Sequence, residues 1–273
     1  MKISGSTSVV GIFGYPVKHS LSPYMQNAAF GALKLDFAYL PFEVKPGQLR
    51  EAVNAVRALG LRGVNVTIPH KESVIRFLDA LDPLARRIGS VNTIVNSNGS
   101  LKGYNTDAIG FIKDLKNKGF NPSNKTVMLV GAGGAGRAVA SALDWAGAKN
   151  ILITDMQESR ARALAAGIKH AEFVGFSNWK SKTGAAALLV NATPAGMRPG
   201  KPLAAAGELT KNIFVYDLVY NRRTELLKEA GKAGAKCANG LGMLLNQGAA
   251  AFELWTGRKA PVDLMRRTLL KNL

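Results

Sequence analysis

The stretch that decides the fold is Thr126-Val-Met-Leu-Val-Gly-Ala-Gly-Gly-Ala-Gly-Arg-Ala-Val-Ala-Ser-Ala-Leu143. An apolar run ends at Val130, a glycine-rich turn follows, and apolar residues then recur at helical spacing. Strand, turn and helix in this order are typical of the first βαβ unit of a dinucleotide-binding domain. Gly131 permits the tight turn, Gly133 lets the backbone approach a pyrophosphate, and Gly136 lets the helix pack closely on the strand. The motif therefore predicts a dinucleotide site at the start of this helix.

The next predicted strand, Ile151-Leu-Ile-Thr-Asp155, ends in a carboxylate 19 positions after Gly136. A carboxylate there accepts hydrogen bonds from ribose hydroxyls and repels a 2′-phosphate, which favours NAD. Met156 follows rather than an arginine. Arg160 and Arg162 come shortly after, so NADP stays open, and Asp155 could also serve as a helix N-terminal acid.

Strands and amphipathic helices alternate outward from this motif, which predicts βαβ units, largely parallel sheets and an α/β fold. Pro46–Leu59 and Arg137–Trp145 have the apolar spacing of crossover helices. Besides Thr126–Val130, the predicted strands are Val9–Phe13, Phe37–Val44, Gly63–Ile68, Asn150–Thr154, Ala187–Asn191 and Ile213–Leu218.

A break in this rhythm predicts two domains. Residues 91–95 and 101–105 flank Asn98-Gly99, a dipeptide typical of a tight hairpin turn. Beyond Gly240 only helices are predicted, over 241–255 and 262–270, and we expect them to return to the first domain. Residues 1–107 plus 240–273 would then form a split α/β substrate-binding catalytic domain, and 108–239 a Rossmann-type dinucleotide-binding domain. We expect the two domains to close on each other.

Composition narrows the function classes. The 273 residues are 47% hydrophobic, and 36 lysines and arginines against 18 acidic residues give a formal charge of +18. The charge is spread as +5 over residues 1–107, +10 over 108–239 and +3 over 240–273, without an arm or stripe, which favours small anionic ligands over nucleic acid. Three histidines and the single Cys237, expected as a core thiol, supply no metal-ligand spacing. No leader or membrane-spanning run is visible, so a cytoplasmic protein without membrane contact is expected.

Three polar segments lie at the ends of predicted strands in residues 1–107, where open α/β sheets bind ligands. His19–Pro23 brings two hydroxyls and a helix start, which would suit a carboxylate. Asn65–Lys71 alternates polar and apolar residues and ends in a lysine, and Asn92-Thr93 with Asn105–Asp107 adds amides and a carboxylate. Each has an ordinary structural alternative: Ser22 and Asp107 could be helix N-caps, and Lys71 a solvated surface charge.

Seven ordered motifs resemble those of the shikimate dehydrogenase family over essentially the whole chain. The resemblance implies reversible reduction of 3-dehydroshikimate to shikimate with a nicotinamide cofactor, in the chorismate pathway of aromatic amino-acid biosynthesis. The motifs are Gly14-Tyr-Pro-Val-Lys-His-Ser-Leu-Ser-Pro23, Asn65-Val-Thr-Ile-Pro-His-Lys71, Gly89-Ser-Val-Asn-Thr93, Tyr104-Asn-Thr-Asp107, Gly131–Gly136, Asn191-Ala-Thr-Pro-Ala-Gly-Met197 and Gly240-Leu-Gly-Met-Leu-Leu-Asn-Gln247.

The family pattern also implies roles for single residues. Ser20 and Ser22 would bind the substrate carboxylate, and Lys71 would be the acid/base residue, paired with Asp107. The other implied substrate-binding residues are Asn65, Thr67, Asn92, Tyr220 and Gln247, of which Thr67, Asn92 and Gln247, together with Asp107, would meet ring hydroxyls. The implied cofactor residues are Gly131, Ala132, Gly133, Gly134, Ala135, Gly136, Asp155, Arg160, Leu218 and Gly240.

The chain departs from the family pattern in two places. Asp155-Met156-Gln157 stands where many members have Asn-Arg-Thr, with only Arg160 kept, and no proline follows Tyr220 by two positions. A quinate or dual quinate/shikimate dehydrogenase using NAD is therefore the alternative, although Ser22 fits shikimate. A non-catalytic NAD-sensing or nucleic-acid-binding protein would suit the charge but leaves Lys71 and Gln247 without a role. A monomer or a homodimer is expected.

Overall fold

The structure is a computed structural model that describes residues 3–273, and the chain in it forms two compact units. The first unit comprises the residues up to Thr106 together with Leu245–Leu273, and the second comprises Asp107–Leu244. Asp107 and residues 240–244 thus belong to the second unit. The assignment of a substrate-binding and a dinucleotide-binding role to the two units stays a prediction at this point.

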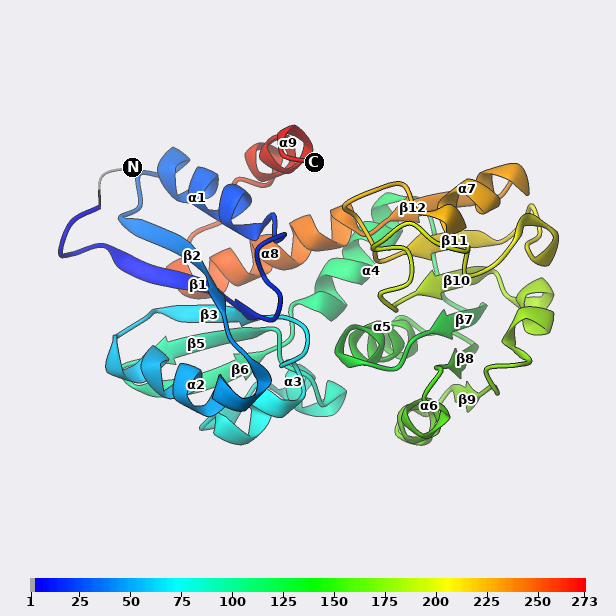
Figure 1. Ribbon diagram of the computed structural model, residues 1–273, viewed down its shortest axis with the longest axis horizontal. Helices are drawn as coiled ribbons and strands as arrows, with labels where there is room; N and C mark the ends of the chain where they lie inside the picture. The colour runs from blue at the N-terminus through cyan, green and yellow to red at the C-terminus, as the bar shows by residue number, and fades with distance from the viewer. Residues whose placement is uncertain (1–2) are drawn as a thin grey trace. The chain divides into compact units, whose positions relative to one another are not determined.

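The first unit is built on a mixed six-stranded sheet with the order β2-β1-β3-β5-β6-β4. Strands β1, β2 and β3 run parallel, whereas β5 is antiparallel to both β3 and β6. Helices α1 and α9 lie on one side of this sheet and α2 and α3 on the other (Figure 1). The elements are β1 (Ser8–Gly14), α1 (Ser22–Ala32), β2 (Phe37–Glu43), α2 (Leu49–Ala58), β3 (Gly63–Val66), β4 (Ala80–Leu81), α3 (Pro83–Ile88), β5 (Thr93–Ser97), β6 (Ser100–Tyr104) and α9 (Val262–Lys271).

The second unit is built on a six-stranded sheet whose strands are all parallel, in the order β12-β11-β10-β7-β8-β9. Helix α4 opens the unit, and the first residues of α8 close it. The elements are α4 (Asp107–Asn117), β7 (Thr126–Val130), α5 (Gly134–Trp145), β8 (Asn150–Thr154), α6 (Glu158–Ala166), β9 (Ala171–Phe173), β10 (Leu188–Asn191), β11 (Phe214–Asp217), α7 (Glu225–Lys232), β12 (Lys236–Asn239) and α8 (Leu241–Thr256).

The α/β fold predicted from the sequence is confirmed, including the hairpin. Strands β5 and β6 pair antiparallel across Asn98 and Gly99, which both adopt positive φ, at 53° and 92°. The strand predicted over Gly63–Ile68 ends earlier, at Val66. Strands β4, β9 and β12 were not predicted, because segments of two to four residues carry too little periodicity to distinguish them from loops.

The expectation that Cys237 is a core thiol is wrong. Cys237 is exposed, and its Sγ lies 3.8 Å from the carbonyl oxygen of Leu227. The reason is its position on β12, an edge strand of the second sheet, where successive side chains alternate and Ala238 is the buried neighbour. Within residues 3–273, no helix has both the length and the apolar content needed to cross a membrane.

Trp255 of α8 packs on one face of the first sheet. Its Nε1 donates to the carbonyl oxygen of Ile94 at 3.0 Å, and its ring centroid lies 6.0 Å from that of Tyr39. A Cβ at Gly63, whose φ is +157°, would meet both the Ile94 carbonyl oxygen and the indole of Trp255. Glycine at this position therefore makes room for the indole.

Trp255→Phe should lower the free energy of unfolding by about 1–3 kcal/mol, because it removes a buried hydrogen bond and part of a buried ring. Urea unfolding measures the change. The matched control is Trp145→Phe, at a tryptophan that is 63% exposed, which should leave the free energy of unfolding nearly unchanged. Equal effects of the two substitutions would contradict the assigned role of the indole.

Candidate functional site

The two hydroxyls of the His19–Pro23 segment lie at the start of α1. Ser22 is its first residue, with Leu21 at the N-cap position, and the backbone amide of Ser22 donates to Ser20 Oγ at 3.3 Å. Ser22 lies inside the helix and is not its cap, whereas Ser20 Oγ accepts from the first helical amide. The N-cap alternative for Ser22 is therefore wrong. The hydroxyls and the helix start remain available as a carboxylate-binding arrangement.

The Asn65–Lys71 segment leaves the end of β3 in a fixed turn. The amide of Thr67 donates to the carbonyl oxygen of Phe13 at 2.9 Å, and the carbonyl oxygen of Lys71 accepts from the amide of Val91 at 2.8 Å. His70, which sequence reasoning did not single out, is buried, and its Nε2 lies 2.7 Å from the carbonyl oxygen of Val44. These contacts hold Thr67 and Lys71, both partly buried, at the carboxyl end of the strand.

Three of the predicted substrate residues meet in one buried cluster of amides in the first unit. Asn65 Nδ2 donates to the carbonyl oxygen of Asn92 at 3.1 Å, and Asn92 Nδ2 lies 3.4 Å from Gln247 Oε1. Thr106 closes the cluster, because its backbone amide donates to Asn92 Oδ1 at 2.7 Å. Asp107 follows Thr106 directly in the chain, is buried, and begins α4 in the second unit.

The glycine-rich turn of the second unit has the shape that a pyrophosphate requires. Gly131 has φ +110°, a Cβ at Gly136 would overlap the carbonyl oxygen of Gly131, and no atom lies within 4 Å of a Cβ built at Gly133. The N-cap of α5 is Gly133, so no side chain occupies the amides of Gly134 and Ala135. The turn is therefore open in front of a helix start, and the chemistry of its donors fits a dinucleotide.

Asp155 is bound to this turn directly. Its Oδ2 accepts from the amide of Ala132 at 2.8 Å, and its Oδ1 accepts from the amide of Gln157 at 2.8 Å. Arg160 is exposed in the first turn of α6. Arg162 instead lies over the Phe173 ring at 3.8 Å and pairs with Glu158 at 3.6 Å. The carboxylate is thus held at the turn, and Arg160 is the nearer of the two arginines along the chain.

A second buried network lies at the carboxyl ends of β10 and β11. Asp217 is fully buried and accepts from Thr224 Oγ1 at 2.6 Å and from Asn191 Nδ2 at 2.9 Å. Burial raises the pKa of Asp217, and the hydrogen bonds from Thr224, Val219 and Asn191 partly offset that increase. Asn191 lies within one of the seven sequence motifs, whereas no local sequence pattern marks Asp217 or Thr224 as functional.

This network sets the start of the loop that carries Leu218 and Tyr220. The amide of Leu218 donates to the carbonyl oxygen of Asn191 at 2.9 Å, and a Cβ at Gly240 would overlap the Leu218 carbonyl oxygen. Burial raises the pKa of the Tyr220 phenol above its ordinary value. The second unit therefore brings Leu218 and Gly240 together.

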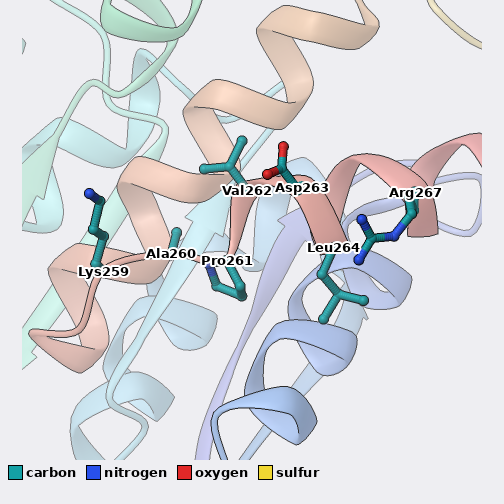
Figure 2. Close-up of a pocket in the computed structure, with 7 residues that line it drawn as sticks. All are labelled: Lys259, Ala260, Pro261, Val262, Asp263, Leu264 and Arg267. Carbon is teal, nitrogen blue, oxygen red and sulfur yellow. The ribbon is translucent and has the colours of Figure 1, made fainter.

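A surface cavity of about 460 Å³ lies at the start of α9 and holds none of the predicted site residues (Figure 2). Its walls come from a short continuous segment and one residue of the following helix turn: Lys259, Ala260, Pro261, Val262, Asp263, Leu264 and Arg267. Over residues 3–273, no group of three or more histidine, cysteine or acidic side chains is arranged to hold a metal ion.

Known families match the chain in three segments. Residues 12–94 match the shikimate dehydrogenase substrate binding domain, residues 114–198 match shikimate / quinate 5-dehydrogenase, and residues 240–270 match the shikimate 5′-dehydrogenase C-terminal domain. A shikimate dehydrogenase (NADP(+)) of Moorella thermoacetica is 47% identical over 280 residues, which cover 98% of this chain and 95% of that protein.

Solved structures agree over the same length. A shikimate dehydrogenase in complex with NADP+ superposes with a TM-score of 0.93 at 40% identity, covering 99% of this chain and 97% of that one. A quinate dehydrogenase from Corynebacterium glutamicum in complex with NAD gives a TM-score of 0.89 at 33% identity, covering 97% and 99%.

The dinucleotide-shaped turn, the buried amide cluster and these matches together define a nicotinamide-dinucleotide-dependent oxidoreductase. The chain belongs to the shikimate dehydrogenase family. The predicted family, fold and enzyme class are confirmed. The roles of the single residues stay predictions.

Asp217→Asn should flatten the pH dependence of stability above pH 3.8, the ordinary pKa of the group. Because burial raises the folded-state pKa, the folded chain binds a proton that the unfolded chain has released. The free energy of unfolding therefore decreases as pH rises through the interval between the two values. Urea unfolding at steps from about pH 4 to pH 7 measures the slope.

Asp36→Asn is the matched control for this measurement. Hydrogen bonds from Thr7 and Ser6 lower the pKa of Asp36, so its contribution to stability is fully present above pH 3.8 and is lost only as pH falls. Its removal should leave the slope above that pH unchanged. Parallel stability curves for the parent and Asp217→Asn would contradict the assigned burial effect.

Proposed function

We propose that this chain catalyses the reversible reduction of 3-dehydroshikimate to shikimate with a nicotinamide dinucleotide. The observation that carries the proposal is the amide cluster of Asn65, Asn92 and Gln247, which concentrates hydrogen-bonding groups in the unit that matches the family's substrate binding domain. A polyhydroxylated ring acid needs such a set of donors and acceptors. The proposed role places the enzyme in the chorismate pathway.

The substrate carboxylate would bind the hydroxyls of Ser20 and Ser22 at the start of α1. An anion there gains both hydroxyl donors and the favourable end of the helix. The ring hydroxyls would bind Thr67, Asn92 and Gln247. The side chains of Asn92 and Gln247 are held by the amide cluster, and the backbone of Thr67 by its bond to Phe13, so little conformational freedom is lost on binding.

The reaction needs one proton for each hydride. A bound dinucleotide supplies the hydride for reduction of the carbonyl carbon, or accepts it in the reverse direction. Lys71 would give a proton from Nζ to the carbonyl oxygen as that oxygen gains charge, and take it back in the oxidation. The Asp107 carboxylate would hold the reacting hydroxyl or the ammonium group in position. Leu218, Tyr220 and Gly240 would line the nicotinamide.

We further propose that NAD is used more efficiently than NADP. Asp155 is held against the dinucleotide turn by the amides of Ala132 and Gln157, so it cannot swing away from an arriving 2′-phosphate without losing both bonds. The position that carries arginine in many family members is Met156, which is 81% exposed. Arg160 offers the opposing attraction from an exposed position. Close repulsion by a fixed carboxylate should outweigh one flexible arginine.

Quinate oxidation is the second candidate, favoured by the match to a quinate dehydrogenase in complex with NAD. That structure pairs the same fold with the cofactor that Asp155 favours. Ser22 has the smaller of the two hydroxyl side chains at the carboxylate position, which supports shikimate as the better substrate.

The function is tested by following the nicotinamide absorbance with shikimate or quinate and with NAD or NADP, in all four combinations. Shikimate with NAD should give the highest kcat/KM. Lys71→Ala should lower kcat by about 10²- to 10⁴-fold with a smaller change in KM, as expected for a lost general acid. Lys271→Ala, at an exposed lysine of α9, is the control. A parent enzyme that oxidises neither substrate would overturn the proposal, and a Lys71→Ala variant near parental activity would remove Lys71 from it.

Cofactor choice is tested with the double variant Asp155→Asn, Met156→Arg. Replacing the carboxylate by a neutral amide and adding a cation should shift the kcat/KM ratio toward NADP by at least about tenfold, and added salt should reduce the contrast. Glu158→Gln removes one charge from the start of α6, just after these two positions, and should leave the ratio unchanged. A parent that already prefers NADP, or a double variant with the parental ratio, would show that Asp155 is not the selector.

A further inference from the structure

A line of buried polar groups crosses the first sheet to Asn92. It begins at Tyr39 on β2, passes Asn65 on β3 and Thr93 on β5, and ends at Asn92. Tyr39 is 1% exposed and Thr93 is completely buried. Tyr39 lies on β2, which is separated from β3 by β1. The proposed substrate contacts do not account for a tyrosine hydroxyl buried at this place.

The hydrogen bonds determine which way the amide of Asn65 faces. The carbonyl oxygen of Asn92 can only accept, so the atom of Asn65 that lies 3.1 Å from it must be Nδ2. Oδ1 then faces Tyr39, and the tyrosine hydroxyl donates to it at 2.8 Å. Tyr39 therefore supplies the donor that Oδ1 needs in the orientation that serves Asn92.

The same bonds continue in one direction to the side chain of Asn92. The second proton of Asn65 Nδ2 goes to Thr93 Oγ1 at 3.0 Å, and Thr93 Oγ1 donates to Asn92 Oδ1 at 3.1 Å. The backbone amide of Thr106 donates to the same oxygen at 2.7 Å, and the two donors together turn Asn92 Nδ2 toward Thr106 Oγ1, at 3.0 Å, and Gln247 Oε1. Both protons of Asn65 Nδ2 are used within the protein, so a substrate hydroxyl can reach Asn65 only through Oδ1.

We propose that Tyr39 is a positioning residue for substrate binding, acting through Asn65 and Thr93 on the amide of Asn92. The proposal rests on the function proposed above, in which Asn92 meets a ring hydroxyl. Tyr39 itself is too deeply buried to touch substrate. Without its hydroxyl, Oδ1 of Asn65 loses its donor inside the sheet, and the orientation of the amide depends only on the two bonds from Nδ2.

The first test is Tyr39→Phe, which removes only the hydroxyl. The KM for shikimate should rise on the order of 3- to 30-fold, while the KM for the dinucleotide stays within about twofold of the parent. The matched control is Val64→Ala. Val64 is the neighbour of Asn65 on β3, is fully buried, and points to the opposite face, into the core beneath α2. Val64→Ala should lower the free energy of unfolding without raising the KM for shikimate selectively.

A second pair of variants keeps the proposal testable if Tyr39→Phe folds poorly. Thr93→Val is nearly isosteric but lacks the hydroxyl that passes the orientation to Asn92, and it should raise the KM for shikimate. Thr93→Ser keeps the hydroxyl and should restore most of the parental KM. A structural role alone would lower the free energy of unfolding of Thr93→Val without raising its KM for shikimate more than its KM for the dinucleotide.

The double variant Tyr39→Phe, Asn65→Ala tests the route of the effect. If Tyr39 acts through Asn65, adding Tyr39→Phe to Asn65→Ala should raise the KM for shikimate little above that of Asn65→Ala alone. Full additivity, or a shikimate KM in Tyr39→Phe no higher than in Val64→Ala, would overturn the positioning role. A parent without activity on shikimate would instead overturn the proposed function on which it rests, so the two failures are distinguishable.

Discussion

The amide cluster of the first unit depends on one constraint, that amide groups taken out of water are costly unless they are hydrogen-bonded. Asn65 and Asn92 are 5% and 2% exposed, and their donors and acceptors draw partners from β2, β5, the strand end at Thr106 and helix α8. An unpartnered group at any of these points would cost more than the bond itself contributes. The cluster therefore requires a particular sheet order as much as it requires particular side chains. The same bonds that satisfy the interior leave the polar ends of Asn92 and Gln247 in fixed directions, which is the condition for selective binding.

In the second unit the buried polar group is a carboxyl group, and its hydrogen bonds only partly offset the cost of burying it. Asp217 accepts three hydrogen bonds from Thr224, Asn191 and Val219, yet burial still raises its pKa. A parallel sheet buried on both faces has few places for such a group, and the carboxyl ends of β10 and β11 are where backbone amides and loop hydroxyls converge. The carboxylate ties the loop after β11 to the loop after β10. Loop residues of the second unit are thus positioned by a buried carboxyl group, whereas the cluster of the first unit is positioned by neutral amides.

How much of this could be predicted from the sequence follows from how local each signal is. The Gly131–Gly136 turn and the Asn98-Gly99 hairpin are encoded in consecutive residues, and both formed as predicted. The partnership of Tyr39 with Asn65 could not be inferred, because it depends on β1 lying between β2 and β3, a pairing between segments distant in the chain. The prediction that Cys237 is buried was wrong for a similar reason. Whether an apolar residue on a four-residue strand is buried depends on where that strand lies in the sheet, and β12 is an edge strand. The residue types of the candidate site were thus visible in the sequence, but the contacts that orient them were not.

The net positive charge of the chain favours NADP, whereas the carboxylate of Asp155 at the end of β8 favours NAD. Residues 108–239 carry a formal charge of +10, and such a field attracts the more anionic dinucleotide more strongly. Most of these charges are dispersed and exposed, however, and at physiological ionic strength they are screened beyond about 8 Å. Asp155 acts at contact distance from the turn, where screening is weak, so the local carboxylate should decide between the two cofactors while the field raises the association rate of both. Cofactor selectivity then depends on Asp155, and the association rate depends on the dispersed basic residues of the same unit. Raising the ionic strength should slow association at salt concentrations that still leave the preference for NAD over NADP largely intact.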